Sequence, residues 1–438
     1  MAARTGHPVI IVGGGLSGLA AGVELSGSGV PVLILEQAPA PGGRARSFRH
    51  PPTNDEVDNG QHLLIAGYTH TLALLSRIGS HHLVEVQKQP ILSFHHPVRG
   101  FVDFRLPPLP SPLHFAWAIL STPMLSLRDR LALLRGGGAL LEEHPVQAAG
   151  MTVAQWLDSH RQAGEVRRCF WEPLAVAIMN ESIDRAPARL FLDALRQAFL
   201  RHRRDAALVF PRAGLSRLFA GPATAYIGGH GGEVRCNAGV AQVTVQSGSA
   251  TGVVLRSGES VQCSAVILAV PAIQLPQLLP ESVASGFSTM SEAAASPIIG
   301  IHLWMDHGFM DRDAVGLIGK RIQWVFRRER HLSLVISAAY RFSGMTNDEL
   351  AGIALEDLRS VFGGAVQEPS HVLVIRERKA TFAPTPGNEN RRPGTETAIS
   401  NLFLAGDWTD TGLPATIEGA IVSGQRAAAM AARALQLK

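Results

Sequence analysis

A glycine-rich turn between an apolar strand and a helix, close to the start of the chain, limits the fold more than any other feature. Residues 9–12 predict a strand that is apolar on both faces, as in the centre of a parallel sheet. The turn over 13–18 follows at once, and a helical pattern continues over 16–25. A second apolar strand over 32–35 ends in Glu36, 18 positions after the last glycine of the turn. This β-α-β unit is typical of a dinucleotide-binding domain.

The three glycines of the turn have different expected roles. Gly13 allows the tight turn, Gly15 lets the backbone approach a diphosphate without a Cβ clash, and Gly18 lets the helix pack closely on the sheet. The N-terminus of the helix offers free backbone N–H groups to phosphates, and those of Leu16 and Ser17 are the expected donors.

Glu36 and a second pair of glycines narrow the identity of the dinucleotide. Glu36 is expected to bind the ribose hydroxyls of the adenosine, and its charge would repel a 2′-phosphate, so we expect FAD or NAD rather than NADP. The sequence Gly42-Gly43-Arg44 follows, and Gly43 and Arg44 can contact the diphosphate or the ribityl chain from the other side. A plain NAD-binding unit does not need this feature, which favours FAD. The alternative is a surface loop.

The segment 58–62 is a polar cluster between structured segments. Gly60 and Gln61 suit backbone contact with a flavin, and His62 is a candidate catalytic residue near its ring. The alternative for His62 is a hydrogen-bonded structural histidine.

A strand, a glycine-aspartate pair and a helix end the chain. Asp407, after Gly406, can hydrogen-bond ribityl hydroxyls, and the helix that starts near Thr416 and Ile417 would point its N–H groups at the flavin pyrimidine. This final segment contains no cysteine or histidine, so a covalent flavin link through it is excluded and the expected FAD is non-covalent.

These elements predict an α/β fold in which the two ends of the chain build one domain. We expect a discontinuous Rossmann-type FAD-binding domain with an inserted α+β substrate domain. The FAD-binding domain is predicted to cover 1–90, 205–295 and 391–438, and the substrate domain 91–204 and 296–390.

Composition excludes several classes of protein. Hydrophobic residues make up 46% and charged residues 17%, which excludes intrinsic disorder. The net charge of +4 comes from scattered basic residues, so nucleic acid is not an expected partner. Cys169, Cys236 and Cys263 are far apart and form no CxxC, so we expect no metal site, no disulfide framework and a reducing, cytoplasmic location. The N-terminal segment is too short and polar for a secretory signal.

An uncharged stretch runs from Leu106 to Leu127 and is long enough to cross a bilayer. Five prolines interrupt it and argue against a continuous spanning helix. A short apolar helix over 113–120 remains as a candidate for peripheral membrane contact through 106–127. The alternatives are a buried helix of the substrate domain and a wall of the cavity.

The motifs, in this order, resemble the flavin amine oxidase and phytoene desaturase superfamily over essentially the whole chain. The resemblance rests on GGGLSG, PGGRARS and FLAGDWTDTGLPATIEGAIVSG, and on Val240, whose counterpart contacts adenine through its backbone. Within that group the chain resembles the hydroxysqualene dehydroxylase family. The segments that carry this second resemblance are DNGQHLLIAGY (58–68), FWEPLAVAIMN (170–180), ARLFLDALRQAF (188–199) and GDWTDTGLPATIEGA (406–420).

The resemblance implies a reductive reaction in which hydroxysqualene loses its allylic hydroxyl and gains a hydride to give squalene. It also implies a long apolar tunnel, an external reductant and neighbouring isoprenoid synthases. The departing hydroxyl needs a proton donor, and Glu172, in an apolar run beside Trp171 and Pro173, is a candidate because burial would raise its pKa. The alternative for Glu172 is a helix-start or ion-pair residue.

Three other functions stay open. Amine oxidation usually requires an aromatic cage around the substrate nitrogen, but Tyr68, Tyr226 and Tyr340 are all far from the final motif in the sequence. Among the few lysines, Lys320 is the best candidate for a partner of flavin N5. Carotenoid or phytoene desaturation uses similar pocket chemistry in the oxidative direction. The third alternative is a non-catalytic prenyl-binding escort protein.

Overall fold

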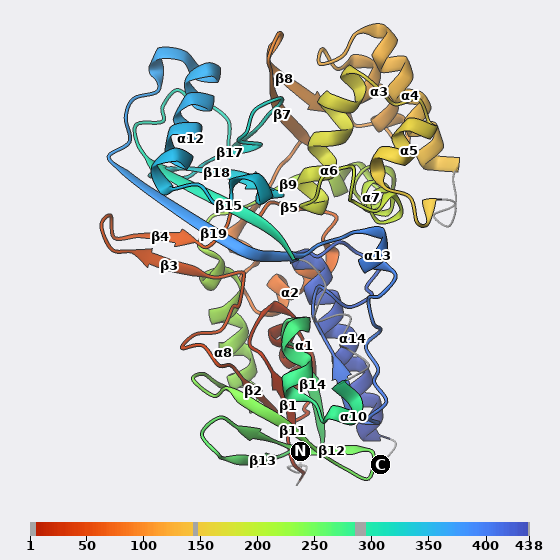
Figure 1. Ribbon diagram of the computed structural model, residues 1–438, viewed down its shortest axis with the longest axis vertical. Coiled ribbons are helices and arrows are strands. Elements are labelled where there is room, and N and C mark those ends of the chain that lie inside the picture. The colour runs from red at the N-terminus through yellow and green to blue at the C-terminus, as the bar shows by residue number, and fades with distance from the viewer. Residues whose placement is uncertain (1–5, 143–147, 285–294, 437–438) are drawn as a thin grey trace.

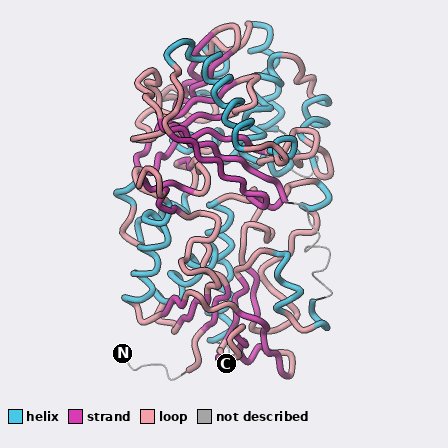
Figure 2. Tube along the Cα trace, turned by 60° about the vertical axis from the view of Figure 1, so that its left-hand side comes forward, coloured by secondary structure: helices cyan, strands magenta, loops and turns pink. Residues whose placement is uncertain are grey.

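The first strand and the last helix of the chain lie in the same half of an elongated molecule. The computed structural model describes residues 6–142, 148–284 and 295–436, and it shows two units stacked along the long axis (Figure 1). The strands gather in separate layers in the two halves (Figure 2). The lower unit in Figure 1 contains β1 and α14, and the upper unit comes from two separate stretches of the chain, coloured orange to yellow and teal to blue.

A parallel sheet forms the centre of the lower unit. Every residue of β1, β2, β14 and β20 is buried, as expected for strands that are apolar on both faces. β20 comes from near the C-terminal end and pairs with β14, which pairs with β1, so the two ends of the chain share one sheet. This confirms the predicted fold class. The order is β10 (Glu233–Arg235), β2 (Val32–Leu35), β1 (Val9–Val12), β14 (Ala265–Leu268) and β20 (Leu402–Leu404).

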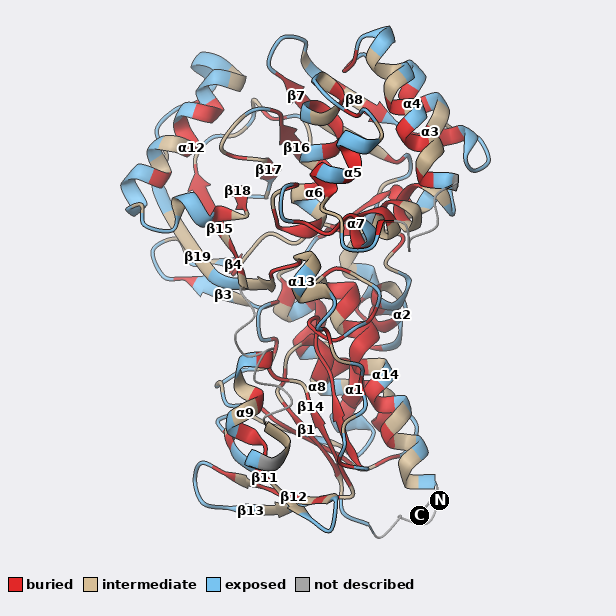
Figure 3. Cartoon of the chain, turned by 45° about the vertical axis from the view of Figure 1, so that its right-hand side comes forward, coloured by how far each residue is buried: buried red, intermediate tan, exposed pale blue. Residues whose placement is uncertain are grey.

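Alternate residues of β1 face two different cores. Val9 and Ile11 pack with helices, whereas Ile10 and Val12 pack with a small antiparallel sheet. Figure 3 shows β1 and β14 buried between elements with exposed outer surfaces. The helices are α1 (Leu16–Gly27), α2 (Thr69–Arg77), α8 (Gly221–Gly229) and α14 (Ile417–Gln436). The small sheet consists of β11 (Val240–Gln246), β12 (Ser249–Leu255) and β13 (Ser260–Gln262), with α9 (Leu275–Leu278) and α10 (Glu281–Ala284) nearby.

Two glycines allow backbone contact around α1. A Cβ at Gly18 would lie 2.0 Å from the carbonyl oxygen of Gly13, and a Cβ at Gly424 would lie 2.0 Å from that of Ser17. A side chain at either position would therefore force α1 away from the turn or from α14. Gly18 has the packing role predicted from the sequence.

A larger mixed sheet forms the upper unit. Ile299, Ile301 and Leu303 face α12, whereas Ile298 and Gly300 lie on the opposite face, the face that α3 to α7 cover. The order is β19 (His371–Phe382), β15 (Ala295–Trp304), β18 (Leu332–Ser337), β17 (Trp324–Arg327), β16 (Ala314–Leu317), β7 (Ile91–His96) and β8 (Gly100–Arg105). The helices are α3 (Leu113–Ser121), α4 (Leu127–Glu142), α5 (Val153–Ser159), α6 (Glu172–Met179), α7 (Ala188–Leu195) and α12 (Asn347–Phe362), with the short α13 (Pro386–Glu389) near the junction.

Two small sheets lie around the junction of the two units (Figure 1). One is the hairpin of β3 (Ser47–His50) and β4 (Asp55–Asp58), and the other contains β5 (Leu64–Ile65), β9 (Leu208–Pro211) and β6 (Val84–Val86). The mixed sheet takes its strands from residues on both sides of β9 to β14, in agreement with an inserted second unit. The domain boundaries given above stay predictions.

The uncharged stretch over 106–127 forms a half-buried helix. In α3, His114, Phe115, Ala118 and Ile119 are buried, while the opposite face is exposed. No helix within the described ranges combines the length and the apolar character needed to cross a membrane. The described stretch contributes no residue to the walls of the large cavity discussed below, so the cavity-wall alternative is wrong.

A cluster of aromatic rings joins the β3–β4 hairpin to the mixed sheet. His50 stacks on Trp304 with 4.6 Å between ring centroids, and His331 lies 5.0 Å from Trp304 and 5.3 Å from His302. Asp55 accepts a hydrogen bond of 2.7 Å from the Trp304 indole. His302 is 2% exposed, and neither of its ring nitrogens has a partner among the described residues. Burial lowers the pKa of His302 to about 3 and that of His331 to about 4.

We expect this cluster to make the protein less stable in acid. Both histidines stay neutral when folded, whereas their ordinary pKa of 6.5 lets them bind protons when unfolded. The free energy of unfolding should therefore fall as pH drops from about 6.5 towards 4, by up to about 1.4 kcal/mol per pH unit for each histidine. Urea unfolding at several pH values measures how the free energy of unfolding changes with pH. His302→Leu should remove the part of this pH dependence that comes from His302. An unchanged slope in that variant would show that His302 does not stay neutral.

Candidate active site

A cavity of about 920 Å³ lies at the junction of the two units. The loops that follow the parallel strands supply one end, and the face of the mixed sheet that includes Gly300 supplies the other. Most of the residues predicted to bind a cofactor line it: Gly13, Gly15, Leu16, Ser17, Glu36, Gly43, Arg44, Gly60, Gln61, Val240, Gly406, Asp407, Thr416 and Ile417. Segments that are more than 350 residues apart in the sequence therefore meet in one place.

The glycine-rich turn leaves an open cradle in this cavity. Gly15 precedes α1 with extended backbone at φ −72°, and a Cβ built on it would meet no heavy atom within 4 Å. Gly13 differs, because its φ of +106° and a Cβ distance of 2.6 Å to the Ala269 carbonyl oxygen require glycine for the turn itself. The N–H groups of Leu16 and Ser17 precede the first backbone hydrogen bond of the helix, which runs from Leu19 to Gly15. The cradle thus fits a diphosphate.

Glu36 is held rigidly at the edge of the cradle. Its two carboxylate oxygens accept hydrogen bonds from the backbone N–H groups of Gly14, at 2.7 Å, and Ala38, at 2.8 Å. The side chain is buried against the protein and borders the cavity together with Val240, the first residue of β11. Each oxygen keeps a lone pair for a ribose hydroxyl.

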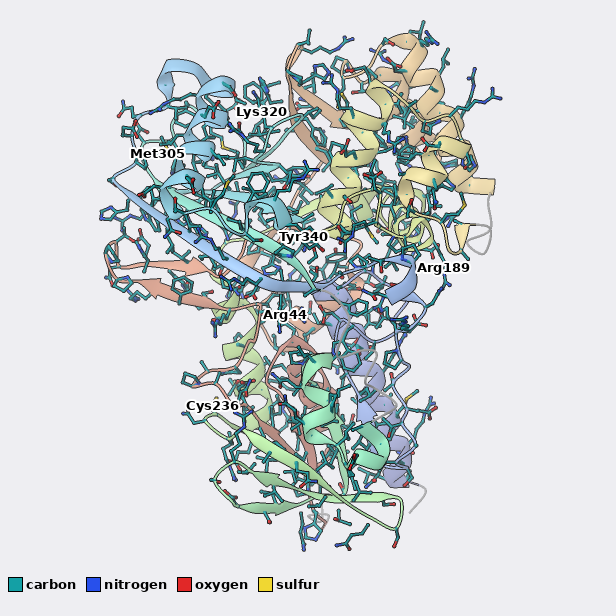
Figure 4. All side chains as sticks on the ribbon, viewed as in Figure 1. Arg44, Arg189, Cys236, Met305, Lys320 and Tyr340 are labelled. Carbon is teal, nitrogen blue, oxygen red and sulfur yellow. The ribbon has the colours of Figure 1, made fainter. Side chains whose placement is uncertain are left out.

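An ion pair connects three segments at the middle of the cavity. The Arg44 guanidinium donates to the Asp407 carboxylate at 2.6 Å and to the Ala380 carbonyl oxygen, on β19, at 2.9 Å. Asp407 raises the pKa of Arg44. Figure 4 shows Arg44 where the two units meet. The sequence predicted both residues as cofactor contacts, but it gave no sign that they pair.

A contact between the ends of two helices also escaped the sequence analysis. Glu418, in the first turn of α14, is buried and accepts hydrogen bonds from the backbone N–H groups of His70 and Thr71 and from the Thr71 hydroxyl. α2 has no acidic residue in its own first turn, so its free N-terminal N–H groups need an acceptor from elsewhere in the chain. This absence is the only signal in the sequence that a distant carboxylate could bind there. Tyr68, just before α2, reaches the cavity, and burial together with Glu418 raises the pKa of Tyr68 to about 12.

The position of Tyr68 differs from the one expected from the sequence. Tyr68 is far from the final motif in the sequence, but it lines the same cavity as Thr416, so the cavity does contain a tyrosine. The lysine in the cavity wall is Lys379 on β19, not Lys320, which lies high in the upper unit in Figure 4. The contact between α2 and α14 places Tyr68, and β19 carries Lys379 into the cavity wall. Distance along the sequence predicts neither position.

His62 lies in the same cavity wall as Gly60 and Gln61. Burial lowers the pKa of His62, the nearby Arg44 lowers it further, and Asp58 opposes the shift. No protein group within the described ranges makes a hydrogen bond to its ring, which leaves both nitrogens available to a ligand. The arrangement suits a proton-transfer group.

Glu172 is not among the residues that line the cavity. It is the exposed first residue of α6, whereas Ala177 and Ile178 of the same helix face the cavity. Five and six residues along a helix correspond to rotations of roughly 140° and 240°, so Glu172 points away from the cavity. Although Glu172 is exposed as a residue, partial desolvation of its carboxyl group raises its pKa, but the structure does not bring this acid to a ligand in the cavity.

The end of the cavity in the upper unit is apolar. Its wall combines aliphatic and aromatic side chains from five elements, and the Trp324 and Phe326 rings lie 6.1 Å apart, nearly parallel. A wall of this kind excludes water and suits a hydrocarbon. We call it the apolar wall, and it consists of Ala177, Ile178, Ile298, Gly300, Trp324, Phe326, Val335 and Phe382.

A second cluster of polar side chains, which does not line the cavity, does not favour a metal ion. His96, Glu165 and Cys169 lie within 4.8 Å of one another. However, Nδ1 of His96 accepts hydrogen bonds from two backbone N–H groups, which leaves the proton on Nε2, the nitrogen that faces Glu165 at 3.5 Å. Burial raises the pKa of Cys169 to about 12, which keeps the thiol protonated.

Comparison with known proteins decides the family. The model of the family "Flavin containing amine oxidoreductase" matches residues 16–431, nearly the whole chain. The chain belongs to the flavin-containing amine oxidoreductase family. The predicted FAD cofactor and the predicted oxidoreductase activity are therefore confirmed, and the cradle at Gly15, the rigid Glu36 and the Arg44–Asp407 pair fit that cofactor.

Relatives within the flavin-containing amine oxidoreductase family include two hydroxysqualene dehydroxylases. That of Zymomonas mobilis is 30% identical over 96% of this chain and 98% of its own length. That of Rhodopseudomonas palustris is 31% identical over 96% and 97%. These relatives confirm the second resemblance. Among solved structures, an oxidoreductase from Methanosarcina mazei matches with a TM-score of 0.75 and 18% identity, over 96% of this chain and 99% of its own, which concerns the fold alone.

Proposed function

We propose that this protein converts hydroxysqualene to squalene by reductive dehydroxylation. The observation that carries the proposal is that one continuous cavity joins the phosphate-binding cradle at Gly15 to the apolar wall. The relatives called hydroxysqualene dehydroxylase support the choice of substrate. In this reaction the allylic C–O bond breaks, a hydride joins the carbon, and the hydroxyl takes up a proton and leaves as water. FAD, when bound and reduced, would supply the hydride, and an external two-electron donor such as a reduced nicotinamide would reduce the flavin again.

The residues around the cradle have separate proposed roles in holding FAD without a covalent bond. The turn (Gly13, Gly15, Leu16 and Ser17) would bind the diphosphate, and Glu36 and Val240 the adenosine. Gly43, Arg44, Gly406 and Asp407 would contact the diphosphate or the ribityl chain, and Gly60, Gln61, Thr416 and Ile417 the flavin. This assignment rests on their common position in the cavity wall.

The apolar wall has two proposed roles. Its aliphatic and aromatic side chains would hold the hydrocarbon through apolar burial, and they would keep water away from the allylic carbon while the C–O bond breaks. A saturated polar substrate would lose these contacts. A long isoprenoid therefore fits this cavity better than a small amine does.

His62 is the proposed proton donor, and this proposal predicts a pH dependence. Burial lowers the pKa of His62 below its ordinary value of 6.5, so His62 loses its proton at a lower pH than a free histidine does. The dehydroxylation rate should therefore fall as pH rises through that lowered pKa. His62→Gln keeps hydrogen bonding without a titrating proton and should slow the reaction about 100-fold and remove the pH dependence. Single-turnover rates at several pH values check this, and a variant with the same profile as the wild type would exclude His62.

The proposed function is tested anaerobically with the purified holoenzyme. Photoreduced protein is mixed with hydroxysqualene, the flavin absorbance is followed, and the products are analysed by gas chromatography and mass spectrometry. The proposal expects reoxidation of the flavin and one squalene per flavin. In parallel, oxidised protein is mixed with phytoene and with an amine. Bleaching of the flavin by either compound, with no reaction of hydroxysqualene, would favour a desaturase or an amine oxidase. A flavin that reacts with none of them would favour the escort protein.

A further inference from the structure

An apolar surface covers two neighbouring helices of the upper unit. Fourteen large hydrophobic side chains are exposed among the described residues, and seven of them lie between 109 and 141. α3 and α4 pack against each other at the upper right in Figure 1. We call this surface the α3–α4 face, and it consists of Leu109, Leu113, Trp117, Leu120, Leu127, Leu131 and Leu141.

Helical spacing keeps these side chains on one side of each helix. Leu113, Trp117 and Leu120 follow the i, i+4, i+7 pattern on α3. Leu127, Leu131 and Leu141 lie at i, i+4 and i+14 on α4, which places them within roughly 80° of one another around the helix. The opposite sides of both helices are buried in the core of the upper unit. The helices are also fixed to each other, because Arg130 donates to the Leu120 carbonyl oxygen at 2.7 Å. The apolar side chains are therefore held outward by a rigid hairpin.

Arginines flank the α3–α4 face. Arg128 and Arg135 are exposed on α4, and Arg201 and Arg204 are exposed in the neighbouring segment, which is tied to the start of the face by a hydrogen bond from Arg203 to the Leu106 carbonyl oxygen. None of these four exposed arginines has an ion-pair partner in the part of the chain that the structure describes. The acidic Asp129 is engaged by the hydroxyl of Ser126 at 2.5 Å.

We propose that the α3–α4 face docks on an anionic lipid surface. Exposed leucines with a tryptophan and flanking unpaired arginines are the composition of an interfacial helix, with the apolar side in the acyl boundary and the cations at the headgroups. The surface extends beyond the predicted stretch 106–127, because α4 supplies half of the leucines and two of the arginines. A second copy of the chain fits this surface less well, since a two-fold contact would bring the same unpaired arginines together.

Lipid docking does not depend on the proposed reaction, and the test needs no substrate. The FAD-loaded protein is sedimented with phosphatidylcholine vesicles, with and without phosphatidylglycerol. We expect binding to the vesicles with phosphatidylglycerol. Leu113→Ser/Leu131→Ser should weaken it at least tenfold, and Arg128→Gln/Arg135→Gln should weaken it about tenfold while leaving weak binding to neutral vesicles unchanged.

A matched control distinguishes binding through the α3–α4 face from non-specific binding through other exposed hydrophobic side chains. Phe48→Ser/Val372→Ser removes two exposed hydrophobic side chains from the other side of the molecule, and it should leave vesicle binding unchanged. FAD content measured on every variant confirms that it is folded.

Trp117 gives a readout at the proposed surface itself. All six tryptophans of the chain lie in described residues, and Trp117 is 58% exposed whereas the others are at most 6% exposed. Brominated lipids should therefore quench fluorescence that disappears in Trp117→Phe. Three results would overturn the proposal: no binding to anionic vesicles, unchanged binding of Leu113→Ser/Leu131→Ser, or a concentration-dependent dimer that shields Trp117 from acrylamide.

Discussion

Gly15→Val should give a folded but colourless protein. The backbone at Gly15 is extended, a conformation open to any residue, and a Cβ there meets no heavy atom beyond its chain neighbours within 4 Å, so a side chain can begin at this position without a clash. The added methyl groups would instead occupy the cradle that a diphosphate needs. Steric overlap and lost hydrogen bonds together cost about 3 to 4 kcal/mol, a loss of FAD affinity of about 100-fold to 1000-fold. Flavin absorbance after gel filtration and calorimetric titration with FAD measure this.

Gly18→Ala is the matched comparison, because it should damage the fold rather than the cradle. Its Cβ would lie 2.0 Å from the Gly13 carbonyl oxygen, and α1 would have to move off the turn. We expect poor expression or a lower melting temperature for Gly18→Ala, and a circular dichroism spectrum like that of the wild type for Gly15→Val. A yellow Gly15→Val protein with normal FAD affinity would place the cofactor elsewhere.

Gly300→Phe should abolish most activity towards hydroxysqualene while FAD stays bound. Gly300 is part of the apolar wall, and a Cβ there makes an ordinary contact, 3.7 Å from His302 Nε2, so the phenyl ring can extend into the cavity. It would displace about one isoprene unit, whose burial contributes about 3 kcal/mol, so kcat/KM should fall about 100-fold. Steady-state kinetics with a chemical reductant measure the loss.

Gly300→Ala is the control for that variant. One methyl group leaves most of the cavity free, so kcat/KM should change less than about fivefold. If Gly300→Phe also loses FAD, or if it keeps full activity, the substrate does not occupy the space along β15.

Local patterns predicted the lower unit well. The apolar run Val9–Val12, the glycine turn and Glu36 each act through neighbouring residues, so the strand, the helix and the second strand could be located from the sequence. The final strand and helix were also expected near 402 and 416.

Long-range contacts account for what the sequence did not predict. The Arg44–Asp407 and Thr71–Glu418 pairs join residues more than 340 positions apart, and nothing local marks one partner for the other. Tyr68 reaches the final motif through the same α2–α14 contact. Glu172 is a residue for which a local pattern was misleading. Its apolar neighbours suggested a buried carboxyl group, but its position around α6 turns the side chain away from the cavity.

Arg392 is a further residue that the sequence did not single out. It is buried and donates to the carbonyl oxygens of Leu413, Asp407 and Thr409, and so holds the loop between β20 and α14 in place. Three backbone acceptors for one guanidinium can be recognised only after the loop has folded around it.

The direction of hydride flow at this cavity is the central claim, and a single turnover in deuterated water tests it most directly. The N5–H of reduced FAD exchanges with the solvent, so hydride transfer from it to the carbinol carbon would place one deuterium in each squalene molecule. We predict squalene with one deuterium at that carbon from the wild type, and none from Gly300→Phe in the same time. Squalene without deuterium, or a flavin that stays reduced while hydroxysqualene is unchanged, would contradict the account.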